Sequence, residues 1–144
     1  MSADCPFCAI AAGDLPARTV HQADTTMAFL DANPLAPGHT LVIPTDHHER
    51  VADLPATVAE DVMTTLHRVA PAVESAVDAD GATIAFNDGT AAGQEVPHVH
   101  GHVVPRFEDD GAGPIHALFD SRPELADETL DRIADDVVDG LSER

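Results

Sequence analysis

Three histidines at alternate positions constrain this chain more than any other feature of its sequence. They are His98, His100 and His102, in the stretch VPHVHGHVVPR over residues 96–106. In an extended backbone, alternate side chains point to the same face and lie roughly 6 to 7 Å apart. The pattern therefore predicts a strand over residues 98–104, with three imidazoles on one face and the intervening Val and Gly residues toward the core.

Hydrophobic periodicity predicts the elements around this strand. Short apolar or β-branched runs indicate further strands, and apolar residues at three- and four-residue spacing indicate helices. Pro71 lies inside the longest helical pattern, where it should kink or split the helix. The predicted strands are 19–22, 27–30, 39–44 and 83–86, and the predicted helices are 5–12, 58–77 and 125–141. This order predicts an α+β fold, in which helices pack on an antiparallel sheet, as a single domain over residues 1–144.

The charge balance is strongly acidic. The chain has 26 acidic residues against 7 basic ones, every basic one is Arg, and the net charge is −19. Such a surface repels itself in dilute buffer but is screened at high salt, which indicates a halophilic protein. It also argues against nucleic acid as a partner, since phosphate binding uses clustered Lys and Arg.

The sequence also bears on location. It holds no apolar run of about 18 residues, so no membrane span is expected. The first residues, MSADCPFCAI, lack the pattern of a secretory signal. We therefore expect a cytoplasmic protein.

The histidine triplet has three interpretations: a solvated polar face, a metal site, or a catalytic site. Imidazole is a common ligand of transition metals. A neutral imidazole can also attack phosphorus while a second one beside it handles a proton. The upstream loop NDGTAAGQEVP favours catalysis, because its backbone N–H groups and the amides of Asn87 and Gln94 could hold phosphate oxygens without Lys. Nearby carboxylates should favour imidazolium over imidazole and so oppose attack by His100.

A separate motif, Cys5-Pro6-Phe7-Cys8, contains both cysteines of the chain. A lone C-x2-C pair in a cytoplasmic protein can be a redox dithiol, half of a zinc site, or two core residues. A structural zinc site would need two further ligands from elsewhere in the sequence.

Several blocks of the sequence together resemble the histidine-triad (HIT) superfamily. They are CPFCAIAAGDLPA, AFLDANPLAPGHTLVIP and NDGTAAGQEVPHVHGHVVPR, which keep the family's order over roughly residues 5–106. The resemblance implies a homodimer whose two sheets join into one. It also implies a nucleotide-binding cleft and hydrolysis or transfer at the α-phosphate of a purine nucleotide conjugate.

The resemblance assigns roles to individual residues. It makes His100 the nucleophile that forms a nucleotidyl-histidine intermediate, with His102 contacting the phosphate and leaving group and His98 orienting the site. Substrate would be bound by the ribose-holding Asp31, the base-pocket residues Phe29, Ala32 and Ile10, and the phosphate-contacting Asn87 and Gln94. Gly101 departs from the family, which often has a bulky residue there, so we expect that face of the strand to be less filled.

The resemblance also completes a structural zinc site. In zinc-bearing members the Cys pair is joined by two histidines, which here gives the ligand set Cys5, Cys8, His47 and His98, with His48 the rival of His47. The substrates that the resemblance implies are nucleoside phosphoramidates or dinucleoside polyphosphates. The alternative class is a nucleotide- or metal-binding sensor with little turnover.

Overall fold

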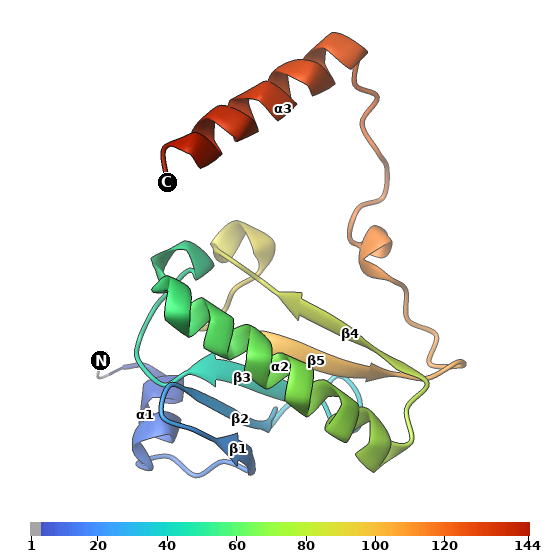
Figure 1. Cartoon of the computed structure of the whole chain (residues 1–144). Helices are drawn as coiled ribbons and strands as arrows, with labels where there is room; N and C mark the ends of the chain where they lie inside the picture. The colour runs from blue at the N-terminus through green and yellow to red at the C-terminus, as the bar shows by residue number, and fades with distance from the viewer. Residues whose placement is uncertain (1–3) are drawn as a thin grey trace. The chain divides into compact units, whose positions relative to one another are not determined.

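The computed structural model describes residues 4–144, which form two compact units, one ending at Asp110 and one over Gly111–Arg144 (Figure 1). Between residues 4 and 144, no helix is both long and apolar enough to cross a membrane. The helices of the first unit are α1 (Pro6–Ala12) and α2 (Ala56–Val77), and its strands are β1 (Thr19–Gln22), β2 (Thr26–Leu30), β3 (Thr40–Pro44), β4 (Gly81–Phe86) and β5 (Gly101–Arg106). A single domain over residues 1–144 stays a prediction.

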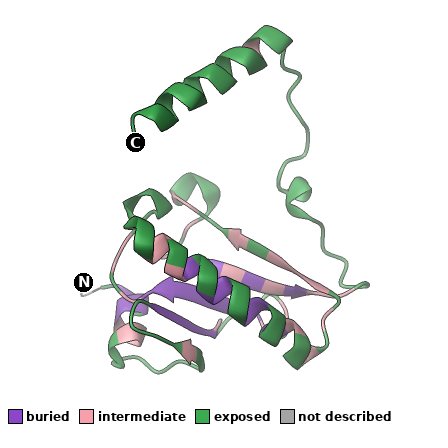
Figure 2. Ribbon diagram, viewed as in Figure 1, coloured by how far each residue is buried: buried purple, intermediate pink, exposed green. Residues whose placement is uncertain are grey.

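The five strands form one antiparallel sheet in the order β1-β2-β3-β5-β4. The α+β prediction is therefore confirmed. Strand β5 lies between β3 and β4, so it connects the two halves of the sheet. Strands β2 and β3 are buried along almost their whole length (Figure 2).

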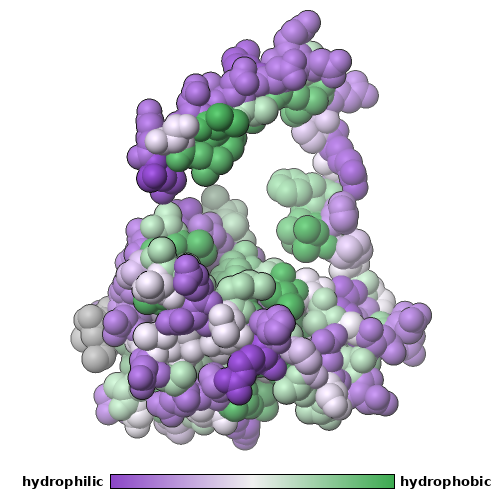
Figure 3. All heavy atoms as spheres, in the orientation of Figure 1, coloured by the Kyte–Doolittle hydropathy of each residue, from purple (hydrophilic) through white to green (hydrophobic). Residues whose placement is uncertain are grey.

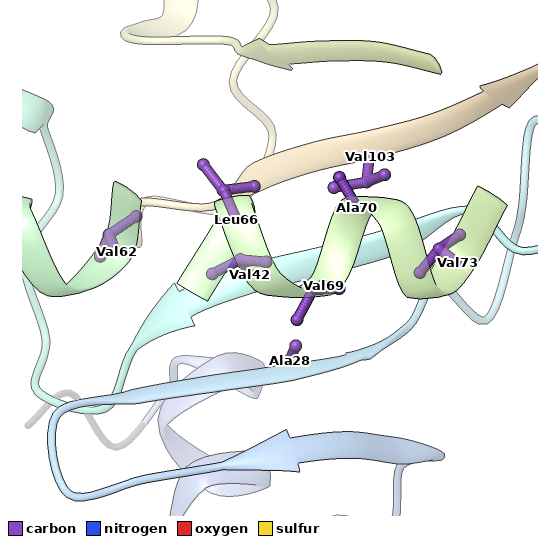
Figure 4. Close-up of a cluster of buried hydrophobic side chains, with 8 residues drawn as sticks. All are labelled: Ala28, Val42, Val62, Leu66, Val69, Ala70, Val73 and Val103. Carbon is purple, nitrogen blue, oxygen red and sulfur yellow. The ribbon is translucent and has the colours of Figure 1, made fainter. Parts of the chain in front are cut away.

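Each face of the sheet has its own helix because strand side chains alternate between the faces. Ala28, Val42 and Val103 point to one face, where they pack against the apolar side of α2 (Figure 4). The neighbouring residues Phe29 and Leu41 point to the other face. There they pack with Phe7 and Cys8 of α1 and with Cys5, Met27 and Ile43.

Helix α2 runs without interruption through Pro71, so Pro71 does not split it. A proline lacks the N–H that would reach the carbonyl of His67, four residues earlier. Both residues are on the exposed side of the helix, where water can serve that carbonyl. On the opposite side, Val69, Ala70 and Val73 are buried against the sheet and hold the helix in place.

Strand β5 begins at Gly101, so the predicted strand over 98–104 is wrong at its start. His98 and His100 lie in the segment just before it, and only His102 is inside it. The ladder with β3 ends at the pair Val42 and Gly101. Pro44, two residues beyond Val42, has no N–H to extend the ladder, and its carbonyl accepts a hydrogen bond from the His98 ring instead (2.9 Å).

Phe86 fills the space over Gly101. A Cβ added at Gly101 would lie 2.8 Å from the tip of the Phe86 ring and 3.4 Å from Leu66. The expectation that this face is poorly filled is therefore wrong. The space that a bulky side chain at residue 101 would occupy is filled here by the Phe86 ring, which extends from the neighbouring strand β4.

The second unit contains a short helical turn, Ile115–Leu118, and helix α3 (Asp127–Ser142). Compared with the predicted helix over 125–141, helix α3 begins two residues later and ends one residue later. Hydrophobic side chains gather along one side of α3 and hydrophilic ones along the other (Figure 3). The apolar side is exposed and consists of Leu130, Ile133, Val137, Val138 and Leu141.

The Gly101–Phe86 contact leads us to expect a loss of stability when a side chain is added at residue 101. We expect Gly101→Val to lower the free energy of unfolding by about 1 to 3 kcal/mol, because the new side chain overlaps the Phe86 ring. Urea unfolding measures the change. Gly81→Val is the matched control, since a Cβ at Gly81 in β4 meets nothing within 4 Å. Adding Phe86→Ala to Gly101→Val should recover part of the loss; a double variant that shows only the sum of the two losses would contradict this contact.

Candidate active site and metal cluster

The three histidines lie together on the α1 side of the sheet. The ring centroids of His100 and His102 are 5.0 Å apart, and the Phe7 ring stands edge-on to both His98 and His100. His98 is completely buried and His100 is 8% exposed. The predicted grouping of the imidazoles is therefore present, although two of them precede the strand.

Hydrogen bonds to backbone carbonyls define the tautomers of His98 and His100. Nε2 of His98 is 2.9 Å from the carbonyl of Pro44, and Nδ1 of His100 is 2.7 Å from the carbonyl of His98. A carbonyl only accepts, so each of these ring nitrogens carries the proton. The remaining lone pairs are therefore Nδ1 of His98 and Nε2 of His100.

His39 defines the tautomer of His102. The N–H of Leu35 donates to Nδ1 of His39 (3.0 Å), so the His39 proton is on Nε2 and is donated to Nδ1 of His102 (2.9 Å). His102 must then carry its own proton on Nε2. Among the described residues, this Nε2 is the one buried side-chain nitrogen or oxygen with no hydrogen-bond partner. His102 thus presents an unused N–H beside the lone pair of His100.

Burial keeps these imidazoles neutral. Desolvation lowers the pKa of His39 and of His98. Desolvation, followed by the neighbouring rings of His100 and His39, lowers the pKa of His102 to about 4. Asp31 acts in the opposite direction on His39 and His102 but is outweighed. Loss of hydration therefore dominates over the carboxylate at these two residues. The expectation for His100 stays a prediction.

The second cluster of the site consists of Cys5, Cys8, His47 and His98, whose ligand atoms all lie within 4.8 Å of one another. Nδ1 of His98 is 3.3 Å from Sγ of Cys5 and 3.6 Å from Sγ of Cys8, and Nδ1 of His47 is 3.3 Å from Sγ of Cys8. Tetrahedral zinc with bonds of about 2.0 to 2.3 Å places its ligands about 3.3 to 3.8 Å apart. The His98 lone pair also points at the thiols, so the donor set fits a tetrahedral ion.

A third group, Asp31, His39 and His102, also brings three possible ligand atoms together. Its tautomers do not suit a metal ion. The Nε2 atom of His39 carries a proton, because Leu35 N–H occupies Nδ1. The hydrogen bonds therefore indicate a chain of imidazoles rather than a second metal site.

The residues predicted to bind the base and the ribose differ in burial and in their contacts. Phe29 is buried edge-on to Phe7 (5.6 Å between centroids), and Ile10 packs against the same apolar cluster. Ala32 is exposed in the following loop. Asp31 accepts the N–H of Asn33 (2.9 Å) as a turn cap, and its other carboxylate oxygen is 3.7 Å from Nε2 of His39.

Gln94 organises the loop in front of the histidines. Its side-chain carbonyl accepts the N–H of Gly89, and its amide donates to the carbonyls of Glu49 and Val96. A phosphate contact from Gln94 would replace one of these bonds and stays a prediction. Asn87 is exposed and, within residues 4–144, makes no hydrogen bond through its side chain.

Two site residues were missed from the sequence. Phe7, inside the C-x2-C motif, contacts both Phe29 and His100, and a single phenylalanine between two cysteines carries no sequence signal of a role in the site. His39 is the first residue of the predicted strand 39–44, which gave it no role in the site, yet it fixes the proton of His102. Its position two residues before Leu41, the first apolar residue of β3, signals a buried strand start, but only the antiparallel pairing of β3 with β5 brings it to His102.

Because the pKa of His102 is lowered, we expect the stability of the protein to depend on pH. In the unfolded chain histidine binds a proton near pH 6.5, whereas folded His102 binds one only near pH 4. The free energy of unfolding should fall as the pH drops from about 6.5 to about 4, by up to about 3 kcal/mol from this group, because the unfolded state takes up more protons there. Urea unfolding at a series of pH values should show a shallower decline for His102→Asn than for the exposed-residue control His116→Asn. Equal declines would assign the effect to other groups.

Comparison with known sequences identifies relatives over most of the chain. The HIT domain family matches residues 12–109. An uncharacterized HIT-like protein of Methanocaldococcus jannaschii is 42% identical over 109 residues, 74% of this chain and 82% of its own length. The adenylylsulfatase HINT3 of Arabidopsis thaliana is 35% identical over 107 residues, 74% of this chain and 54% of its own length. The bis(5'-nucleosyl)-tetraphosphatase of Schizosaccharomyces pombe is 40% identical over 83 residues, 58% of this chain and 46% of its own.

Solved structures show the same fold. The protein SMU.412c of Streptococcus mutans superposes with a TM-score of 0.86 at 34% identity, over 98% of this chain and 87% of its own. A zinc-bound histidine triad family protein of Mycobacterium smegmatis has a TM-score of 0.72 at 38% identity, over 88% of this chain and 87% of its own. With the sheet, the three imidazoles and the family match in agreement, this chain belongs to the HIT family.

Proposed function

We propose that this protein is a nucleotide hydrolase or nucleotidyl transferase that acts at the α-phosphate of a purine nucleotide conjugate. One observation carries the proposal: the His100 Nε2 lone pair lies beside an unpartnered, buried Nε2–H of His102. A nucleophile next to a hydrogen-bond donor is what displacement at phosphorus requires.

The reaction follows from the two tautomers. Nε2 of His100 attacks the α-phosphorus, a P–N bond forms, and the leaving group departs with the electron pair of its bond to phosphorus. The N–H of His102 donates a hydrogen bond to the phosphate and to the departing atom, and so stabilises the charge that develops there. Water, or another acceptor in a transfer reaction, then breaks the P–N bond, releases the nucleotide and returns the lone pair to His100.

The surrounding residues bind and position the substrate. Asp31 holds the ribose hydroxyls, and Phe29, Ile10 and Ala32, now joined by Phe7, enclose the base. Asn87 and Gln94 lie on the phosphate side of the substrate. Gln94 contributes chiefly through the side-chain hydrogen bonds that hold the conformation of its loop. His98 positions His100, since the His98 carbonyl holds its Nδ1–H.

The names of two relatives bear on the substrate. One is an adenylylsulfatase and the other a dinucleoside tetraphosphatase, and both names denote cleavage next to a nucleotide phosphate. They support the general reaction and leave nucleoside phosphoramidates and dinucleoside polyphosphates as the two substrate classes. The alternative function is a nucleotide or metal sensor with little turnover.

We further propose that Cys5, Cys8, His47 and His98 bind a structural zinc ion. Support comes from the ligand spacing, from the lone pair that His98 directs at the thiols, and from the zinc-bound relative. When bound, zinc would supply four bonds that tie α1 to the segment before β5. We also propose that the protein works as a cytoplasmic enzyme in high salt, since its two cysteines form no disulfide and its charge is −19 without any Lys.

We also propose a homodimer in which two sheets join at β4. This six-residue strand is an edge of the sheet, and its residues Ile84 and Phe86 are exposed. An edge strand with free backbone groups and apolar side chains readily pairs with another strand.

His100→Ala should abolish turnover but keep nucleotide binding. Wild-type protein mixed with an adenosine phosphoramidate or with diadenosine tetraphosphate should release AMP, and we expect the variant to be slower by about 10³-fold or more. AMP binding by calorimetry should be similar in both proteins, and His116→Ala serves as the control. If the wild type binds AMP but is as inactive as His100→Ala on both substrates, the protein is a sensor.

Added KCl should raise both stability and turnover. At about 0.1 M salt charges still interact over roughly 10 Å, whereas at about 1 M this distance falls to roughly 3 Å, and the repulsion within the chain and toward the substrate is screened. Melting temperature and initial rate, measured over this range, provide the check. A melting temperature that is highest at low salt, or a rate that declines steadily with KCl, contradicts the halophilic assignment.

Ile84→Lys should convert the dimer to a monomer, because a charge in the middle of β4 disfavours edge pairing. Light scattering of the purified proteins gives their masses. Glu60→Lys, on the exposed side of α2, is the control and should stay dimeric. A wild-type chain that runs as a monomer at all concentrations would exclude the dimer.

A further inference from the structure

The four residues of the proposed metal cluster differ in how they can be reached. Cys8 and His47 line a pocket of about 280 Å³, together with Ala11, Ala12, Thr45 and Asp46. Cys5 and His98 are not part of its wall, and His98 has no exposed surface. The cluster therefore has one accessible outer ligand, His47, which is partly exposed. Cys8 reaches the pocket wall but is only 2% exposed, and Cys5, at 4%, forms an inner pair with His98.

The inner pair is also held more firmly by the protein. The His98 ring donates to the carbonyl of Pro44 and stands edge-on to Phe7. Cys5 caps the first turn of α1, where its sulfur accepts the N–H of Cys8 at 3.3 Å. Among the described residues, the His47 ring has no hydrogen bond other than its contact with Cys8, and it is partly exposed.

A carboxylate stands at the open side of the pocket. Asp46 is exposed and forms part of the lining, next to His47 in the sequence. A carboxylate attracts a divalent cation and can coordinate it weakly before stronger ligands take over. The pocket thus combines an attracting charge, enough room for a small molecule, and two of the four ligands at its wall.

We propose that a divalent metal ion enters and leaves the cluster through this pocket, with His47 exchanged first while Cys5, Cys8 and His98 retain the ion. This inference rests on the proposed metal site. An incoming donor bonds to the ion as the His47 Nδ1 bond breaks, and the released imidazole keeps the lone pair. His98 stays bound meanwhile, so its carbonyl keeps its hydrogen bond to His100 during exchange.

The first test measures metal release from the full chain loaded with Co²⁺. The thiolate-to-cobalt absorption reports binding, and its decay after addition of EDTA gives the release rate. Ala12→Phe places a ring in the mouth of the pocket, since Ala12 is exposed there, and should slow release by about tenfold or more. Ala72→Phe, an exposed helical alanine beside a pocket on the opposite face of the sheet, is the matched control and should release at the wild-type rate.

The second test uses chemical rescue. His47→Ala removes the outer ligand and leaves a gap that opens into the pocket, so added imidazole should restore the wild-type cobalt spectrum. Ala12→Phe combined with His47→Ala should need far more imidazole for the same recovery. His98→Ala should not be rescued, because imidazole cannot reach the inner position.

The outcomes separate the route from the metal site itself. If the wild type takes up no Co²⁺ with a thiolate absorption, the proposed metal site fails. If it binds Co²⁺ but Ala12→Phe and Ala72→Phe release it equally fast, and imidazole does not rescue His47→Ala, the site stands and the route is wrong. Slower release from Ala12→Phe together with rescue of His47→Ala alone supports the route.

Discussion

The hydrogen bond from the His98 ring to the carbonyl of Pro44 is the interaction on which both clusters depend. It places the His98 proton on Nε2 and so leaves the Nδ1 lone pair for the two thiols. The backbone carbonyl of the same residue holds the Nδ1–H of His100 and thereby leaves the lone pair of His100 on Nε2. One buried residue thus couples the Cys5, Cys8 and His47 cluster to His100, through its ring on one side and its backbone on the other.

Burial keeps His39 and His102 neutral within a strongly acidic chain. The net charge of −19 would favour protonated histidines if the rings were in water. On the α1 side of the sheet, however, desolvation outweighs Asp31 at both His39 and His102. Because hydration stabilises the charged ring most, its loss keeps the pair neutral. The acidic residues can therefore cover the exposed surface while these two imidazoles stay neutral.

Much of the fold and the grouping of the site residues could be predicted from local pattern. Strands 19–22 and 27–30 and the helix after residue 56 follow from periodicity, and Gly13 ends α1 as a glycine in the left-handed conformation does. The start of β5 could not be predicted, since it depends on Pro44 lying opposite the histidines. The filling of Gly101 by Phe86 and the contact of His39 with His102 likewise depend on which strands are neighbours.

The sequence by itself determined the chemical inventory: three imidazoles at alternate positions, two thiols three residues apart, and an acidic surface without lysine. These are properties of composition and spacing, which hold in any conformation. The tertiary structure alone decided which ring nitrogen carries each proton and which side chains lie at a pocket wall. Both depend on acceptors and neighbours that are distant in the chain, such as Pro44 for His98 and Leu35 with His39 for His102, and only the packed sheet brings them within hydrogen-bonding distance.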